Sequence, residues 1–215
     1  SAYIDWHIEQ VINHELVDRN AIKSANLKVV VDAVNSTGGI SIPPLLRQLG
    51  VDIVPLYCEP NGEFPHNPEP LKKHLTEISE LVKKENADLG IVVDPDVDRL
   101  AIIDENGEMI GEEYTLVSVA DYVLSHQPGA CVSNLSSSRA LSDIAKKHGC
   151  DYFASAVGEV NVVEKMKAKD AVIGGEGNGG VIIPDLHYGR DSLIGTALFL
   201  SHLVHSQTTC SQLRA

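Results

Sequence analysis

The 215-residue sequence lacks the long apolar runs and the basic excess that mark two large classes of protein. No apolar stretch approaches the roughly 20 residues of a membrane-spanning helix, so we expect no membrane insertion. No basic segment followed by a short apolar stretch stands at the N-terminal end, so no signal peptide is indicated. The formal net charge of −13 argues against nucleic acid as a partner, because nucleic acid requires a basic surface.

Closely spaced cysteine pairs and nucleotide-binding motifs are also missing. The four cysteines are scattered without a Cys-x-x-Cys pair, which favours reduced thiols in a cytoplasmic protein over disulfides or a zinc site. Without a Gly-x-x-x-x-Gly-Lys-Ser/Thr motif, nucleotide hydrolysis of the P-loop type is unsupported. The composition, with 43% hydrophobic and 22% charged residues, is typical of a soluble globular protein.

Apolar β-branched runs alternate with helix-period segments, and the same order occurs twice. Strands are predicted at 27–34, 51–57, 89–93 and 100–103, and again at 130–135, 151–157, 171–174 and 181–183. The alternation predicts an α/β fold of two similar α/β domains, each a mixed, mostly parallel sheet flanked by helices. We place the domains at 1–108 and 109–215. Residues 1–20 are interpreted as a lead-in helix with no obvious place in either domain.

The most informative segment follows the third predicted strand. Asp94, Asp96 and Asp98 stand at alternate positions, and Arg99 follows them directly. Carboxylates this close repel one another, and a hard divalent cation such as Mg²⁺, which prefers oxygen ligands, would relieve the repulsion. An arginine can grip a phosphate through two parallel hydrogen bonds. Metal and phosphate together indicate phosphoryl chemistry.

Three other interpretations compete for this aspartate segment. The first is a solvated turn. The second is an EF-hand, in which these aspartates would fill positions 1, 3 and 5, but Arg99 occupies position 6, where a glycine is required. The third, which stays open, is a phosphatase of the haloacid-dehalogenase type, with Asp94 as nucleophile and Asp96 as acid. In that family threonine or valine usually stands at the position of Asp98, and the later lysine and acidic metal loop are not evident here.

A second unusual segment runs from Gly175 through Glu176, Gly177, Asn178 and Gly179 to Gly180. Glycines let the backbone approach a ligand closely, and the glutamate and asparagine could bond to sugar hydroxyls. The glycines alone fit a plain hairpin turn, but a glutamate in so tight a turn favours a binding loop. Both unusual segments follow the third strand of their half, and open α/β sheets bind ligands at the carboxyl ends of strands.

Together these two segments resemble those of the α-D-phosphohexomutases. Asp94-Pro95-Asp96-Val97-Asp98-Arg99 is similar to the metal loop of that family, written DGDGDR. The segment from Gly175 to Gly180 is similar to its sugar-binding loop, often GEMSGH, and Val157-Gly158 with 163–166 resembles the stretch before that loop. The resemblance covers nearly the whole chain and corresponds to the second and third domains of a four-domain enzyme.

The resemblance implies a role for each matching residue. Asp94, Asp96 and Asp98 would ligate Mg²⁺ as the cofactor, and Arg99 would steady a phosphate as the catalytic residue of this segment. Substrate binding would fall to Glu176 and Asn178, which would hold sugar hydroxyls, together with Gly175 and Gly158. Family members move a phosphate between C1 and C6 of a hexose through a bisphosphorylated intermediate.

The sequence also departs from the family pattern. Gly177, Asn178 and Gly180 stand where methionine, serine and histidine are common. No Thr-Ala-Ser-His-Asn-Pro stretch for the phosphoserine and no phosphate loop of the fourth domain are found. We therefore expect a central piece of a cytoplasmic phosphohexomutase, inactive alone, whose partners are a hexose phosphate and the missing first and fourth domains. A phosphatase and a non-catalytic sugar-binding module stay open as alternatives.

Two further segments carry weaker signals. Arg190 and Asp191 follow the glycine segment, where the arginine is a candidate for binding phosphate and the aspartate is predicted to cap a helix. The long loop from Pro60 to Pro70 contains Asn61-Gly62, a pair typical of a turn, but suggests no function.

Overall fold

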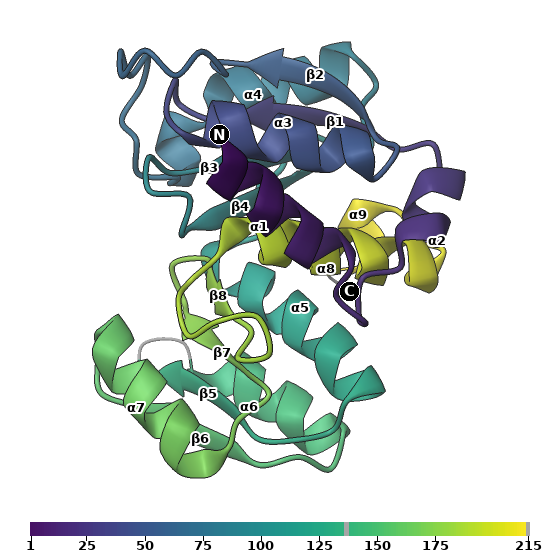
Figure 1. The fold of residues 1–215 in the computed structure, drawn as a ribbon. Coiled ribbons are helices and arrows are strands. Elements are labelled where there is room, and N and C mark those ends of the chain that lie inside the picture. The colour runs from purple at the N-terminus through teal and green to yellow at the C-terminus, as the bar shows by residue number, and fades with distance from the viewer. Residues whose placement is uncertain (136–137, 214–215) are drawn as a thin grey trace.

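Two four-stranded sheets, each with helices on both faces, make up the protein (Figure 1). The computed structural model describes residues 1–135 and 138–213. The predicted architecture, two mixed and mostly parallel sheets flanked by helices, is confirmed. No helix among the described residues is long and apolar enough to cross a membrane.

The first sheet has the strand order β2-β1-β3-β4, in which only β4 is antiparallel. Its elements are β1 (Lys28–Asp32), α3 (Gly38–Gln48), β2 (Asp52–Leu56), the short 3₁₀ helix η1 (Lys72–His74), α4 (Thr76–Lys84), β3 (Leu89–Val93) and β4 (Leu100–Asp104). Every residue of β3 is buried, which explains its unbroken apolar sequence. Val29 and Val31 face the main core, whereas Val30 between them packs with α4 on the other face.

The second sheet repeats the arrangement with the order β6-β5-β7-β8, in which β8 is antiparallel. Its elements are α5 (Glu112–His126), β5 (Cys131–Asn134), α6 (Ser138–Lys147), β6 (Tyr152–Ser155), α7 (Glu159–Lys169), β7 (Ile173–Glu176) and β8 (Gly180–Ile182). Gly175 and Glu176 therefore end a strand, and only 177–179 form the turn of a hairpin. Of the predicted helix caps at 136–138, positions 136 and 137 lie outside the described residues.

The segment 1–20 is not one helix, contrary to expectation. It forms α1 (Ala2–Ile12), a turn, and the start of α2 (Arg19–Ser24), because Asp18 caps a new helix by accepting a hydrogen bond from the backbone of Ala21. Both helices contact α8 (Ser192–Ser206), and α1 also contacts α3. The lead-in segment thus packs between the two halves (Figure 1).

Helix α8 joins the two sheets into one apolar core. It contacts elements of both halves, among them α5, β8, β4 and α3, and the short α9 (Cys210–Leu213) follows it. One cluster of buried side chains includes residues from both sheets and from α8, among them Val29, Ile91, Cys131, Ile173 and Phe199. Phe199 is fully buried in this cluster.

We expect Phe199→Ala to lower the free energy of unfolding by about 3–5 kcal/mol, because it removes a fully buried aromatic ring and leaves a cavity. Urea unfolding followed by circular dichroism measures the change. Phe64→Ala is the matched control, since Phe64 is 45% exposed. A loss in Phe199→Ala no greater than in the control would contradict a shared core around α8.

Candidate functional site

The aspartate loop and the glycine loop, defined as residues 94–99 and 175–180, are brought together at the carboxyl ends of β3 and β7 by a hydrogen bond from the residue that directly follows the aspartate loop. The backbone N–H of Leu100 donates to the carbonyl of Gly179 at 3.1 Å. Gly179 has a φ of +97°, and a Cβ there would lie 2.4 Å from the carbonyl oxygen of Leu100. A glycine is therefore required at position 179 for the two loops to approach this closely.

Arg190 forms ion pairs with three carboxylates from three different segments. Its Nη2 lies 2.6 Å from Oδ2 of Asp98, its Nη1 lies 2.9 Å from Oε2 of Glu176, and its Nε donates to Oε2 of Glu159 at 2.9 Å. Only 14% of the arginine side chain is exposed. One guanidinium thus bridges the aspartate loop, the glycine loop and the first residue of α7, and its single positive charge offsets part of the charge of the three carboxylates.

The space for Arg190 comes from Gly180. A Cβ built at that position would lie 2.3 Å from Cδ and 2.9 Å from Cγ of the arginine. Any larger residue at position 180 would force the arginine side chain to move. The glycine and the arginine are therefore linked by packing.

Asp94 is the most buried carboxylate of the aspartate loop. Its Oδ1 accepts hydrogen bonds from the backbone N–H groups of Asp98 and Arg99, both at 3.1 Å. Burial, and next the neighbouring Asp98 carboxylate, raise the pKa of Asp94 to about 6. Carboxylate oxygens are ligands that suit a hard cation, but in the described residues the three aspartates do not bring three ligand atoms within 4.8 Å of one another, and Asp96 is exposed to solvent.

Arg99 makes only loose contacts. Its Nε lies 3.7 Å from Oδ2 of Asp94 and its Nη1 lies 3.7 Å from Oε1 of Glu69, and its side chain is 32% exposed. These distances exceed those of charge-assisted hydrogen bonds. The guanidinium can therefore reorient toward an anion at the aspartate loop at little cost.

On the glycine loop, Glu176 is buried and paired on both oxygens. Its Oε1 accepts from the side-chain amide of Asn134 at 3.2 Å, while its Oε2 faces Arg190. The Oδ1 of Asn178 is buried without a hydrogen-bond partner among the described residues. A buried acceptor in this condition is costly, and a ligand donor would satisfy it. Gly158, with a φ of +114°, precedes α7 and so sets the direction of Glu159.

A third group of titratable side chains lies beside these loops. Among residues 1–135 and 138–213, only His7, His187 and Asp191 form a group of three potential metal ligands with ligand atoms all within 4.8 Å of one another. Both histidine Nε2 atoms lie within hydrogen-bond distance of Oδ2 of Asp191, at 2.6 Å and 2.8 Å. Burial alone would raise the pKa of Asp191, but the bonds from the histidines hold it well below its ordinary range.

This histidine group ties α1 to the start of α8. The backbone N–H of Gly189 donates to Nδ1 of His187 at 2.9 Å, so the proton of the neutral ring lies on Nε2, facing Asp191. In this form of the ring, Nε2 of His187 therefore has no free lone pair with which to bind a metal.

Asp191 also caps α8, because its Oδ1 accepts a hydrogen bond from the backbone N–H of Leu193 at 2.8 Å. The predicted capping role of this aspartate is therefore observed.

Two models of one protein family match the chain. The model described as phosphoglucomutase/phosphomannomutase, alpha/beta/alpha domain II, matches residues 3–107, and the one for alpha/beta/alpha domain III matches residues 111–215. The chain belongs to the phosphoglucomutase/phosphomannomutase family. The resemblance stated from the two loops is thereby confirmed.

Relatives within this family share the whole chain but extend beyond it. A phosphoglucomutase/phosphomannomutase of Thermococcus kodakarensis is 40% identical over 96% of this chain and 45% of its own length. A probable phosphoglucosamine mutase of Methanopyrus kandleri is 30% identical over 99% of this chain and 46% of its own. The chain spans less than half the length of these relatives.

A solved structure of the family agrees with the fold. The crystal structure of a phosphoglucomutase/phosphomannomutase family protein from Burkholderia thailandensis superposes with a TM-score of 0.86 at 28% identity, covering 98% of this chain and 45% of that one. A structure of a phosphomannomutase described as putative, from Thermus thermophilus, has a TM-score of 0.90 at 23% identity, which supports the fold alone.

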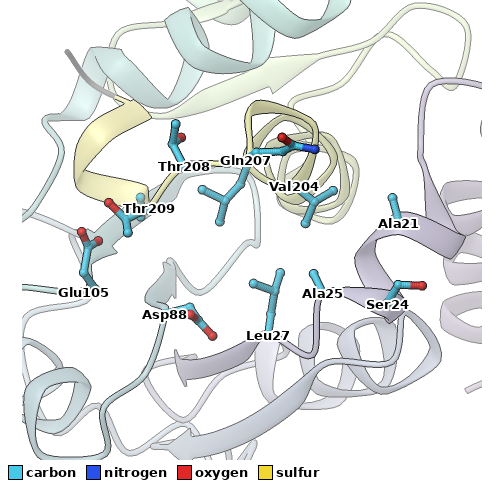
Figure 2. A pocket seen from close by; sticks show the side chains of 12 residues that line it. Ala21, Ser24, Ala25, Leu27, Asp88, Glu105, Val204, Gln207, Thr208 and Thr209 are labelled. Atoms are coloured by element: carbon cyan, nitrogen blue, oxygen red, sulfur yellow. The ribbon is translucent and has the colours of Figure 1, made fainter.

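Two cavities differ in whether predicted site residues line them. A cavity of about 270 Å³ lies between α1, the aspartate loop and the start of α8, and its lining includes Asp96, Arg190 and the histidine group. Another cavity, of about 500 Å³, lies between α2 and the end of α8 (Figure 2). Its lining includes Leu27, Val204 and Thr209, and none of the predicted site residues is among its lining residues.

The loop from Pro60 to Pro70, whose role the sequence does not suggest, is anchored at the edge of the site. Nε2 of His66 lies 2.7 Å from Oδ2 of the buried Asp32, and its Nδ1 lies 2.8 Å from the carbonyl oxygen of Asn67. Both ring nitrogens face acceptors, so this environment favours the doubly protonated ring. The hydrogen bond to Asp32 raises the pKa of His66 above its ordinary value.

We expect the contribution of His66 to stability to depend on pH. Because its folded-state pKa lies above the ordinary 6.5, the contribution is fully present below that value and is lost as the pH rises through the folded pKa. The urea midpoint of the wild type should exceed that of His66→Gln by more at about pH 5.5 than at about pH 9. His74→Gln, a histidine of η1 outside this contact, is the control. A constant difference across this range would show that the pKa of His66 is the same in the folded and unfolded states.

Proposed function

We propose that this chain supplies the metal-binding and sugar-binding portion of a phosphohexomutase, which moves a phosphate between C1 and C6 of a hexose phosphate through a bisphosphate intermediate. The observation that carries the proposal is that the glycine loop contacts the chain immediately after the aspartate loop, where the N–H of Leu100 donates to the carbonyl of Gly179 at 3.1 Å. A phosphoryl group at the first loop and a sugar at the second would then be neighbours, as phosphoryl transfer requires.

The aspartate loop would serve the phosphoryl group. Asp94, Asp96 and Asp98 would hold Mg²⁺, which when bound neutralises charge on the transferring phosphoryl group. The oxygen-only donor set and the mutual repulsion of Asp94 and Asp98 support this assignment. Arg99, held only by contacts of 3.7 Å, would turn toward a phosphate oxygen and steady it.

The glycine loop would orient the sugar. Glu176 would accept hydrogen bonds from sugar hydroxyls, and Oδ1 of Asn178, which has no partner among the residues that the structure describes, would accept another. Gly175 would belong to the same binding loop, and the loop needs a glycine there because a Cβ would lie 2.1 Å from the carbonyl oxygen of Gly180. Gly158, which directly precedes α7, would contribute to the same sugar-binding surface.

The two units would be the second and third domains of a longer cytoplasmic enzyme, divided near Glu108. The chain spans less than half the length of its relatives, which supports this proposal. The first and fourth domains of the same polypeptide would supply the phosphoserine and a second phosphate loop. The substrate class would be a hexose phosphate, in keeping with relatives named phosphoglucomutase, phosphomannomutase and phosphoglucosamine mutase.

Isothermal titration with Mg²⁺ tests the metal assignment. We expect weak binding to the wild type and a loss of roughly tenfold or more in Asp96→Asn, because a carboxylate ligand is removed from an exposed position. Asp52→Asn removes the same charge from an exposed position at the start of β2 and should leave the affinity nearly unchanged. Equal affinities in the wild type and Asp96→Asn would refute the assignment.

We expect no mutase turnover from this 215-residue chain with α-D-glucose 1-phosphate and glucose 1,6-bisphosphate, assayed as formation of hexose 6-phosphate. The reason is that the proposed phosphoserine lies in another domain. Robust turnover would contradict this division of labour. Release of phosphate from p-nitrophenyl phosphate that disappears in Asp94→Asn would instead favour the phosphatase alternative. A hexose affinity that does not change when the three aspartates are substituted would favour a non-catalytic sugar-binding module.

A further inference from the structure

Arg190 occupies a position that the proposed function does not explain. Its three ion-pairing nitrogens each face a different carboxylate, and one of these belongs to Asp98, a proposed ligand of the cation. We propose that Arg190 is a positioning residue that competes with the divalent cation for Asp98 and so sets the affinity of the aspartate loop for that cation. The inference rests on the proposed metal role of Asp98 and adds the group that controls it.

The competition follows from the short contact between Arg190 and Asp98. The 2.6 Å distance from Nη2 to Oδ2 means that this oxygen already holds a positive partner. A cation that binds the same carboxylate must share it with the guanidinium or displace it, and the two positive groups repel each other. A guanidinium does not lose its proton at ordinary pH, so Asp98 can be released only by movement of the side chain.

The other contacts of Arg190 determine how far it can move. Nε and Nη1 are held by Glu159 and Glu176, which stand at the start of α7 and the end of β7. The aliphatic part of the side chain packs against Gly180, whose lack of a Cβ leaves room for it. Two nitrogens of the guanidinium are therefore held by carboxylates of the second domain, while the third, Nη2, reaches Asp98 in the aspartate loop.

Titration of Mg²⁺ into three chains tests the proposal. Arg190→Gln should bind Mg²⁺ at least about fivefold more tightly than the wild type, the lower end of typical couplings between sites. Arg47→Gln removes the same charge from an exposed position at the end of α3, where screening by salt should leave the affinity within about twofold. Circular dichroism establishes that each chain is folded.

A second variant separates the contact from the charge and guards against misfolding of Arg190→Gln. Gly180→Ala keeps Arg190 but places a methyl group 2.3 Å from its Cδ, so the side chain must shift. We expect tighter Mg²⁺ binding here too, with a smaller change. In addition, the Nε–H resonance of Arg190 in the wild type should move during the titration with the same dissociation constant as the calorimetric one. A purely structural arginine would give neither result.

The outcomes distinguish this inference from the proposed function. If the wild type binds Mg²⁺ and both Arg190→Gln and Gly180→Ala bind it equally or more weakly, the competition is refuted while the metal site stands. If none of the chains binds Mg²⁺, the metal assignment itself fails, and the competition fails with it.

Discussion

Two acidic loops repel each other unless a positive charge between them offsets part of the repulsion, and in this protein Arg190 provides that charge. Asp98, Glu159 and Glu176 come from a strand-connecting loop, a helix start and a strand end, and all three lie within 2.9 Å of one guanidinium. Without that cation the mutual repulsion of the three carboxylates, strengthened by partial burial, would oppose the contact between the two loops. The arrangement of the candidate site therefore depends on this ion-pair cluster.

The cluster in turn requires the two sheets to keep a fixed relation, which the shared core supplies. Helix α8 contacts elements of both halves, and Asp191 at its start is held by histidines from α1 and from the segment before α8. The backbone N–H of Ser192 also donates to the carbonyl of Val97 in the aspartate loop at 3.0 Å. Because Arg190 directly precedes these residues, the packing of α8 fixes the position from which the guanidinium reaches the three carboxylates.

The fold and the two loops could be predicted because their signals are local. A β-branched run that ends in acidic residues or glycines is visible in a short window, so Asp94 and Glu176 could be assigned to strand ends. The partners of Arg190 could not be predicted, since Glu159 and Asp98 are distant in sequence and carry no motif that pairs them with an arginine. The contact between His66 and Asp32 was missed for the same reason, although a charged residue that ends an apolar strand was a usable signal.

The departure of the glycine loop from its family pattern can now be given a physical reason. Gly180 stands where a histidine is common in the family, so the loop lacks the large polar side chain that this position often carries. In the structure the side chain of Arg190 lies where a Cβ of residue 180 would point, with its Cδ 2.3 Å away. A positive group is thus brought to this part of the loop from another position in the chain. Two residues that look independent in the sequence are alternatives for the same space, so neither can be interpreted without the other.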